Sequence, residues 1–406
     1  MSNRGHIILT LLIIIISISL IPVYDSYSWW DIGHMELAAR AIDFLPDGWR
    51  EFYKHYEYFI RETSVWPDTV LARLPGESYN HYYDSEYPIE AHERDPSKGR
   101  LPWRVKELMD ELTRYIRDGD WYKVLETSGI LSHYLADICQ PYHTTVDYNP
   151  PVTSNVSAPG VRPKHGVIEG VHAQYIDEII PRDLNITPVY IDDPFRFIFR
   201  IINESYSFLP EVNRILLGED ITDPSDDRDW PEIKPILENR SIRAIWLIAS
   251  MWYTAIVDAD ALDKAPDPRG FIELSIEVRD FDIPEKPLLL YIDFMVVDGI
   301  GVPVDPDRVR FIFGVDEVEP LRLGLGRYQA EIISSLLRKY SGMDIEIRIE
   351  ASKDGYGSAI ESIEVSIPKY IVGEEAPTPN YMEYIIIVIL ILVMSVALYI
   401  RFIKRR

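Results

Sequence analysis

Cysteine is nearly absent from this chain: among 406 residues, Cys139 is the only one. An intrachain disulfide is therefore impossible, and so is a zinc site built from several thiolates. The usual argument from cysteine pairs to an oxidising compartment is lost as well. If the chain binds a metal, the ligands must come from His, Asp and Glu.

Positive charge is also scarce, since 41 Lys and Arg face 65 Asp and Glu and the formal net charge is −24. This charge balance argues against a protein that binds nucleic acid through a basic surface. It does not exclude a nuclease whose bound metals supply positive charge locally. Hydrophobic residues make up 47% of the chain, and its length allows two domains of ordinary size.

Long apolar runs occur only at the two ends. The first, about residues 7–21, is followed by Ser26 and Ser28, which predicts a signal peptide over residues 1–28 that is cleaved before Trp29. The alternative is an uncleaved anchor helix. The second run predicts a transmembrane helix over residues 384–403 with a cytoplasmic tail, 404–406, because basic residues follow it. The predicted protein is then a single-pass protein of the cell membrane with an extracellular N-terminal ectodomain.

Between these ends the hydrophobic pattern changes once. Residues 29–262 space apolar side chains three and four apart and predict a helical domain. Residues 263–372 alternate with period two and predict a β-sandwich (Ig-like) domain, joined by a linker, 373–383, to the membrane helix. The predicted fold class is thus mainly α, plus a C-terminal β-sandwich domain and one transmembrane helix. The expected helices are Met35–Phe44, Val105–Ile116, Tyr122–Ile138, Phe195–Leu217 and Ile242–Val257. The expected strands are Phe271–Val278, Leu288–Val297, Val309–Val315, Ile345–Glu350 and Ile363–Ile367, with Gln329–Tyr340 open between helix and strand.

One stretch of the helical part places residues of metal-ligand type at the spacing of a helix face. His133 and Asp137 lie four residues apart, so they share one face of a helix and can converge on one ion. Pro141 ends that helix and frees His143 from its register. Taken alone, a His/Asp pair of this kind is more often an ordinary surface pair.

Further residues of the same types recur along the helical part, and His165 with Glu169 repeats the four-residue spacing. The others are Trp29 and His34 in the segment that would open the mature chain, Asp68 after Trp66-Pro67, and His81 in His81-Tyr82-Tyr83-Asp84. Mixed imidazole and carboxylate ligands suit Zn²⁺.

These motifs, in this order, resemble the zinc-dependent phospholipase C family, which is related to the zinc-dependent single-strand nucleases. The stretch from His133 to His143 matches the family's central motif, and His81 to Asp84 looks like its phospholipase version. The opening, from Trp29 to His34, is closer to the nuclease branch. The resemblance covers about residues 29–262 and leaves the β domain unexplained.

The resemblance implies a cluster of three Zn²⁺ ions. One would be held by Asp68, His81, His133 and Asp137, and a second by His143, His165 and Glu169. The third would use His34, Asp137 as a bridge, and both the carbonyl and the free amine of Trp29. Only a cleaved chain presents that amine. Asp68 would double as the catalytic base for the attacking water.

The function predicted from these residues is a zinc-dependent phosphoric diester hydrolase, most simply phospholipase C-like, acting on phospholipid outside the cell from its membrane anchor. A zinc-dependent single-strand nuclease or 3′-nucleotidase, with nucleic acid as substrate, is the alternative. A non-catalytic, zinc-stabilised surface protein is a second alternative. Thr69 stands where choline-specific relatives look to have a tyrosine, which leaves the head-group preference open. Oligomeric state and the partner of the β domain are open as well.

Overall fold

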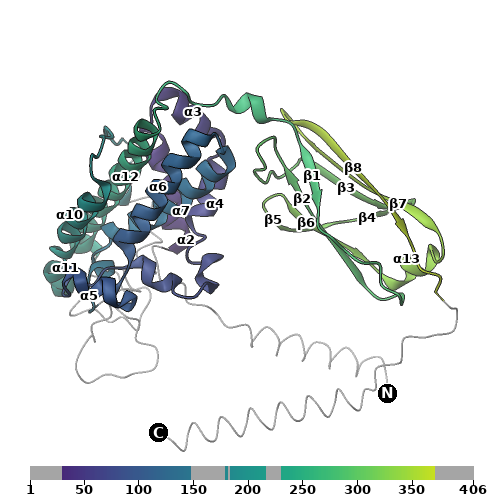
Figure 1. Ribbon diagram of the computed structural model, residues 1–406, viewed down its shortest axis with the longest axis horizontal. Helices are drawn as coiled ribbons and strands as arrows, with labels where there is room; N and C mark the ends of the chain where they lie inside the picture. Colours follow the sequence, from purple (N-terminus) through teal and green to yellow (C-terminus); the bar gives the residue numbers. More distant parts are fainter. Residues whose placement is uncertain (1–29, 148–178, 182, 216–229, 371–406) are drawn as a thin grey trace, which may run out of the picture. The chain divides into compact units, whose positions relative to one another are not determined.

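The computed structural model describes residues 30–147, 179–181, 183–215 and 230–370. The chain divides into two compact units, with the boundary between Phe271 and Ile272. In the described residues the first unit is helical and the second is built of strands (Figure 1). The predicted leader over 1–28, the linker over 373–383 and the tail over 404–406 lie outside the described residues.

The helical unit contains the predicted helices and several that were missed. Its α-helices are α2 (Trp30–Ile42), α3 (Asp47–His55), α4 (Glu57–Ser64), α5 (Ile89–Arg94), α6 (Leu101–Asp118), α7 (Trp121–Cys139), α10 (Pro194–Tyr206), α11 (Leu209–Ile215) and α12 (Trp230–Asp258). The predicted single helix over 195–217 is wrong, because α10 ends at Tyr206 and α11 begins at Leu209. Pro210, which lacks an N–H, is accommodated only in a first helical turn, so it fits the start of a new helix.

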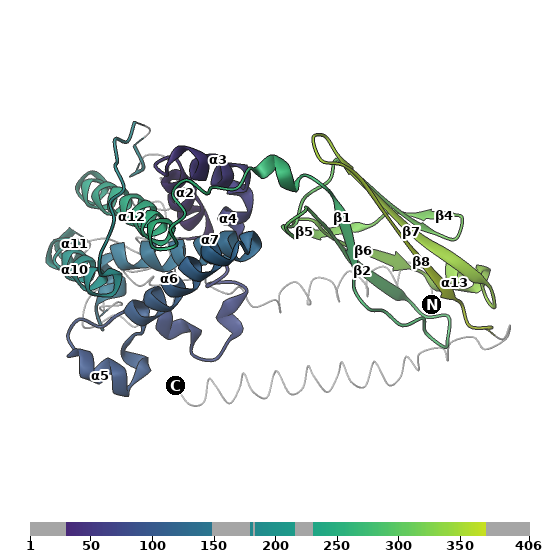
Figure 2. The same cartoon turned by 45° about the horizontal axis from the view of Figure 1, so that its top comes forward.

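Helix α7 is the central element of the helical unit. It contacts α2, α4, α6, α10 and α12, and Figures 1 and 2 show it between these helices. Gly119, in the left-handed region with φ of +73°, turns the chain out of α6. The side chain of Asp120 then caps α7 by accepting a hydrogen bond from the Lys123 backbone N–H at 3.2 Å. Every residue from Thr127 to Cys139 is buried, so α7 runs through the core.

Helices α4 and α7 approach each other closely at Gly129. A Cβ atom placed on Gly129 would lie 1.9 Å from the Thr63 Oγ1 and 2.8 Å from the Ile60 carbonyl oxygen, both on α4. The Thr63 hydroxyl cannot easily turn away, because it donates to the Phe59 carbonyl at 2.9 Å. A glycine is therefore required at this crossing, and the crossing sets the distance between α4 and the following turn of α7.

The second unit is a sandwich of two four-stranded antiparallel sheets, with strand orders β1-β2-β6-β5 and β4-β3-β7-β8. The strands are β1 (Ser275–Val278), β2 (Leu290–Val297), β3 (Arg308–Phe313), β4 (Asp316–Val318), β5 (Leu321–Gly324), β6 (Arg327–Ile332), β7 (Asp344–Lys353) and β8 (Gly357–Ser366). The stretch over 329–340 that the sequence left open is the end of β6 followed by a short helix, α13 (Ser334–Lys339).

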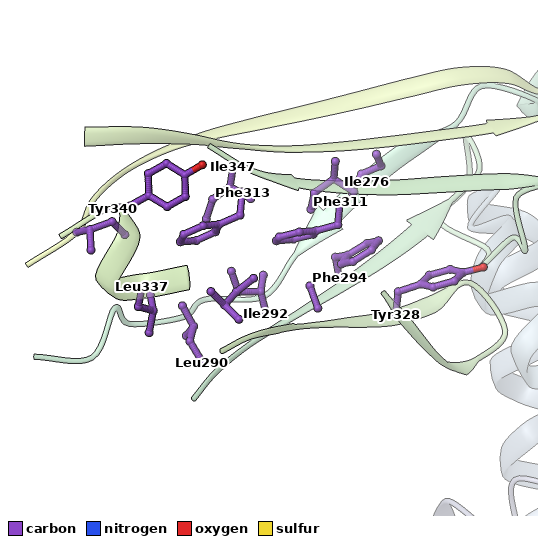
Figure 3. Close-up of a cluster of buried hydrophobic side chains, with 14 of the residues drawn as sticks. Ile276, Leu290, Ile292, Phe294, Phe311, Phe313, Tyr328, Leu337, Tyr340 and Ile347 are labelled. Atoms are coloured by element: carbon purple, nitrogen blue, oxygen red, sulfur yellow. The ribbon is translucent and has the colours of Figure 1, made fainter. Parts of the chain in front are cut away.

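Alternate residues of the strands meet between the two sheets, as the period-two pattern predicts. Leu290, Ile292 and Phe294 of β2 point into the same core as Phe311 and Phe313 of β3 (Figure 3). The rings of Phe294 and Phe311 stack across the sheets with centroids 5.9 Å apart. The β unit thus has a hydrophobic core of its own.

The transmembrane component of the predicted fold class is wrong for the part of the chain that the structure describes. None of the described helices is both long enough and apolar enough to cross a bilayer. Helix α12 has the necessary length, but it carries Glu232, Lys234, Arg240 and Arg243. The predicted span over 384–403 lies outside the described residues. The single-pass location in the cell membrane depended on such a span, so this prediction is corrected too, and the membrane contact through a C-terminal helix is not supported.

The close crossing at Gly129 generates a stability prediction. Gly129→Ala should lower the free energy of unfolding by about 1–3 kcal/mol, because overpacking forces α4 and α7 apart. Gly270→Ala is the matched control, since a Cβ at Gly270 meets nothing within 4 Å. Chemical denaturation of both variants measures the difference. A Gly129→Ala variant as stable as the control would show that the crossing accommodates a Cβ atom without strain.

Candidate metal centre

Six of the residues predicted as metal ligands lie together in the helical unit. His34 is on α2, Asp68 is in the turn after α4, and His81 ends a 3₁₀ helix, η2 (Glu77–His81). His133 and Asp137 are on α7, and His143 is on a second 3₁₀ helix, η4 (Pro141–Thr144). The remaining predicted ligands, Trp29, His165 and Glu169, lie outside the described residues.

The break after α7 puts His143 beside the ligands on the helix. Gln140 leaves the helical conformation and its side chain accepts a hydrogen bond from the Tyr142 backbone N–H. Pro141 occupies the first position of η4, where its missing N–H costs nothing. The chain thereby folds back within one turn, and the Nε2 of His143 comes to 3.8 Å from the Oδ1 of Asp137.

The Asp137 carboxylate lies between four imidazoles. Its Oδ2 faces two of them, at 3.1 Å from the Nδ1 of His81 and 3.4 Å from the Nε2 of His133. Its Oδ1 faces the other two, at 3.6 Å from the Nε2 of His34 and 3.8 Å from the Nε2 of His143. Each oxygen is thus directed at a different pair of histidines, which is the arrangement of a carboxylate that can bridge two ions.

Asp68 borders the same group from the other side. Its Oδ1 is 3.6 Å from the Nδ1 of His81 and 3.7 Å from the Nε2 of His133. The ring of His34 stacks on that of His133 with centroids 3.8 Å apart. The Asp68 side chain is 16% exposed, whereas that of Asp137 is 0% exposed. Asp68 is therefore the carboxylate of the pair that solvent can reach.

Burial and mutual charge decide the protonation of this group. Burial lowers the pKa of His133 well below its ordinary value, and the nearby His34 lowers it further. Burial would raise the pKa of Asp137, but the surrounding histidines, His143 first, hold that pKa below its ordinary value. At neutral pH the centre therefore offers a carboxylate and an unprotonated imidazole, the forms that bind a metal ion.

Backbone carbonyls orient two of the imidazoles from behind. The Nδ1–H of His133 donates to the Ser64 carbonyl at 2.8 Å, and the Nδ1–H of His143 donates to the His81 carbonyl at 2.6 Å. These bonds leave the Nε2 atom of each ring as the acceptor that faces the centre. Hydrogen bonds of this kind typically fix the tautomer of metal-binding histidines.

The structure adds one residue that sequence reasoning missed, the buried Glu77. Its Oε1 lies 3.7 Å from the Nε2 of His81, on the side of the ring away from Asp137. The Glu77 carboxylate also accepts hydrogen bonds from the Tyr134 hydroxyl and, at 3.0 Å, from the Asn80 side chain. The four-residue spacing from Glu77 to His81 was a usable signal, the same as that of His133 and Asp137.

The donor set suits zinc. Four imidazoles and two carboxylates surround a small volume, and the ligand atoms of His81, His133 and Asp137 all lie within 4.8 Å of one another. Those of His34, Asp68 and His133 do the same. Nitrogen and oxygen ligands in this mixture are those of zinc sites in hydrolases.

Comparison with known proteins supports the motif-based prediction of the family. Residues 33–206 match the sequence model of the family described as zinc dependent phospholipase C. A search of solved structures also returns the alpha toxin of Clostridium absonum and the alpha-toxin of Clostridium perfringens from avian strain SWCP. The first is 12% identical with a TM-score of 0.40, and the match covers 84% of this chain and 95% of the toxin. The second is 12% identical with a TM-score of 0.33, covering 82% and 98%. Comparison with curated proteins gives no significant match.

The position of Glu77 generates a prediction about metal affinity. Glu77→Gln keeps the size of the side chain but removes the negative charge that faces His81. We expect zinc affinity to fall about 10–100-fold, the usual effect of removing a carboxylate behind a metal-binding histidine. Competition with a chelator measures this. Glu232→Gln, a change at an exposed ion-paired carboxylate on α12, is the control and should bind zinc like the parent. Equal affinities in the two variants would exclude an orienting role for Glu77.

Asp84, three residues after His81, generates a prediction about pH. Its side chain is buried at 5% exposure, and burial, followed by the charge of Glu86, raises its pKa to about 7. The unfolded chain ionises this group near pH 4. The folded state therefore binds more protons between about pH 4 and 7, and this contribution to stability is lost as pH rises through 7. Asp84→Asn should be more stable than the parent at pH 8, with a smaller advantage at pH 5. Denaturation at both pH values measures it, and Asp110→Asn, at an exposed position, should show no such trend.

Proposed function

Because residues 33–206 match the model of the zinc-dependent phospholipase C family, we propose that this chain hydrolyses the phosphodiester bond of a phospholipid. The observation that carries the proposal is the meeting of four imidazoles and Asp68 around the buried Asp137. These residues come from four helices of the helical unit, α2, η2, α7 and η4, and from the turn after α4. An unbalanced buried charge destabilises a fold. A carboxylate at 0% exposure between histidines is therefore not what a purely structural role would select.

We propose that the ligands divide among three zinc ions as the family resemblance implies. One ion would be held by Asp68, His81, His133 and Asp137. This group is supported by the Oδ2 atom of Asp137, which faces both His81 and His133. His34 and the Oδ1 of Asp137 would hold another together with Trp29. His143 would hold the remaining ion together with His165 and Glu169.

Zinc bound in such a site lowers the pKa of a coordinated water and offsets the negative charge of the phosphate oxygens. The residues of the chain then have separate tasks. Asp137, fully buried, keeps the imidazoles in place and takes no part in proton transfer. Asp68 is open to solvent on one side, so it is placed to accept the proton of the water that attacks phosphorus.

The phospholipid is favoured over nucleic acid as the substrate. The description of the matching family names a phospholipase C. The formal net charge of −24 disfavours a polyanionic substrate. Both substrate classes use the same metal chemistry, so the substrate has to be tested directly.

The test uses the zinc-loaded chain that begins at Trp29, so that its free amine is present, with phosphatidylcholine or phosphatidylethanolamine in mixed micelles, and with single-stranded DNA. Release of diacylglycerol, abolished by a chelator and restored by zinc, is the expected result. Release of nucleotides instead would replace the proposal with a nuclease. Zinc binding that stabilises the fold without cleavage of either substrate would show a non-catalytic surface protein.

The variant Asp68→Asn sharpens this test. It should lower kcat by about 100-fold or more, as expected for loss of a general base, while most of the zinc remains because His81, His133 and Asp137 are intact. Zinc content is measured beside the rate. Asp110→Asn on α6 is the control and should retain full activity. Full activity in Asp68→Asn would remove Asp68 from the proposed mechanism.

A further inference from the structure

We propose that a cavity of the helical unit binds a small organic oxyanion. The cavity has a volume of about 490 Å³ and lies between α10, α12 and the segment over residues 185–187. Its wall includes Thr187, Glu204, Asn239, Arg240, Arg243 and Trp246, none of which belongs to the candidate metal centre. A volume of this size is typical of sites for small organic ligands.

The charges that line the cavity leave a positive excess. Two guanidinium groups, those of Arg240 and Arg243, share the single carboxylate of Glu204. Arg240 is only 1% exposed, and its guanidinium also donates to the Asn239 Oδ1, at 3.1 Å from Nε and 2.7 Å from Nη2. A buried guanidinium remains charged, so one positive charge in the wall is not balanced by Glu204.

Arg243 has hydrogen-bonding capacity that Glu204 does not use up. Its Nη2 donates to Glu204 at 2.8 Å, while its Nε is buried and has no hydrogen-bond acceptor. Its guanidinium stacks on Trp246, 4.5 Å from the ring centroid, which fixes its orientation. The Arg243 side chain is 30% exposed, so the accessible part of its guanidinium can donate a charge-assisted bond to a carboxylate or phosphonate oxygen in the cavity.

The rest of the wall is preformed and partly apolar. The segment that follows Thr187 is fixed to α12, because the backbone N–H groups of Val189 and Ile191 donate to the hydroxyls of Ser250 and Thr254 at 3.2 and 3.0 Å. Ile186, Ile242 and Trp246 give the cavity an apolar side. The ligand is therefore an anion with a small apolar body, not a bare inorganic ion.

The experiment titrates the zinc-loaded full-length chain with butyrate and with butylphosphonate, which share one apolar tail and differ in the anionic group. Tryptophan fluorescence and the thermal midpoint are both recorded. We expect a saturable response to at least one probe, and the preferred probe identifies a carboxylate or a phosphate-type ligand. Binding of the phosphonate at the metal centre is a separate event that substitutions in this cavity leave intact.

Asn239→Asp is the decisive variant. It keeps the acceptor for Arg240, so the fold is retained, and it adds the negative charge that cancels the positive excess. Arg243→Gln removes the partly exposed guanidinium and should weaken binding about tenfold or more, the effect of losing one charge-assisted bond. Arg214→Gln is the control, because Arg214 also pairs with two carboxylates, Glu211 and Glu232, but does not line the cavity.

The expected outcome is that the probe response disappears in Asn239→Asp, weakens in Arg243→Gln and is unchanged in Arg214→Gln. If neither probe gives a saturable response in the parent chain, the proposal is overturned. A response that survives Asn239→Asp at full strength overturns it equally, because the probe then binds elsewhere.

Discussion

The structure of the helical unit depends on one buried negative charge. Asp137 sits at 0% exposure on α7, and taking a carboxylate out of water costs several kcal/mol unless it is paired. Four imidazoles from α2, η2, α7 and η4 surround it. Elements that are distant in the sequence are thereby required to meet at one place, and a metal ion bound there would balance the charge that the histidines only partly neutralise.

The sequence predicts the part of this centre that depends on local geometry. The spacing of His133 and Asp137 on one helix face, and the break at Pro141 that redirects His143, follow from helix periodicity and from the missing proline N–H. The zinc-dependent phospholipase C family was recognised from these residues, and the match over residues 33–206 bears this out. The alternation in the β unit likewise predicts most of its long strands.

Features that arise only from packing could not be predicted. The Ser64 carbonyl, which accepts a hydrogen bond from His133, has no signal in the sequence, so only the assembled fold shows its role. Strands β4 and β5 are short and contain no buried residue, which leaves them without a hydrophobic pattern. The break between α10 and α11 was missed because the apolar spacing runs on through it. The terminal apolar runs invited a membrane assignment that no described helix supports.

The uninterrupted burial of α7 has a consequence for how this chain can vary. A helix at a protein surface has one side on which substitutions are tolerated, and its sequence drifts there. From Thr127 to Cys139 this helix has no such side, since neighbouring helices enclose it all round. Its small residues are constrained by the space between the helices. Its polar residues are constrained equally, by the groups that they contact. Descendants of this chain should therefore differ first at its loops and outer helices, and last along this one segment.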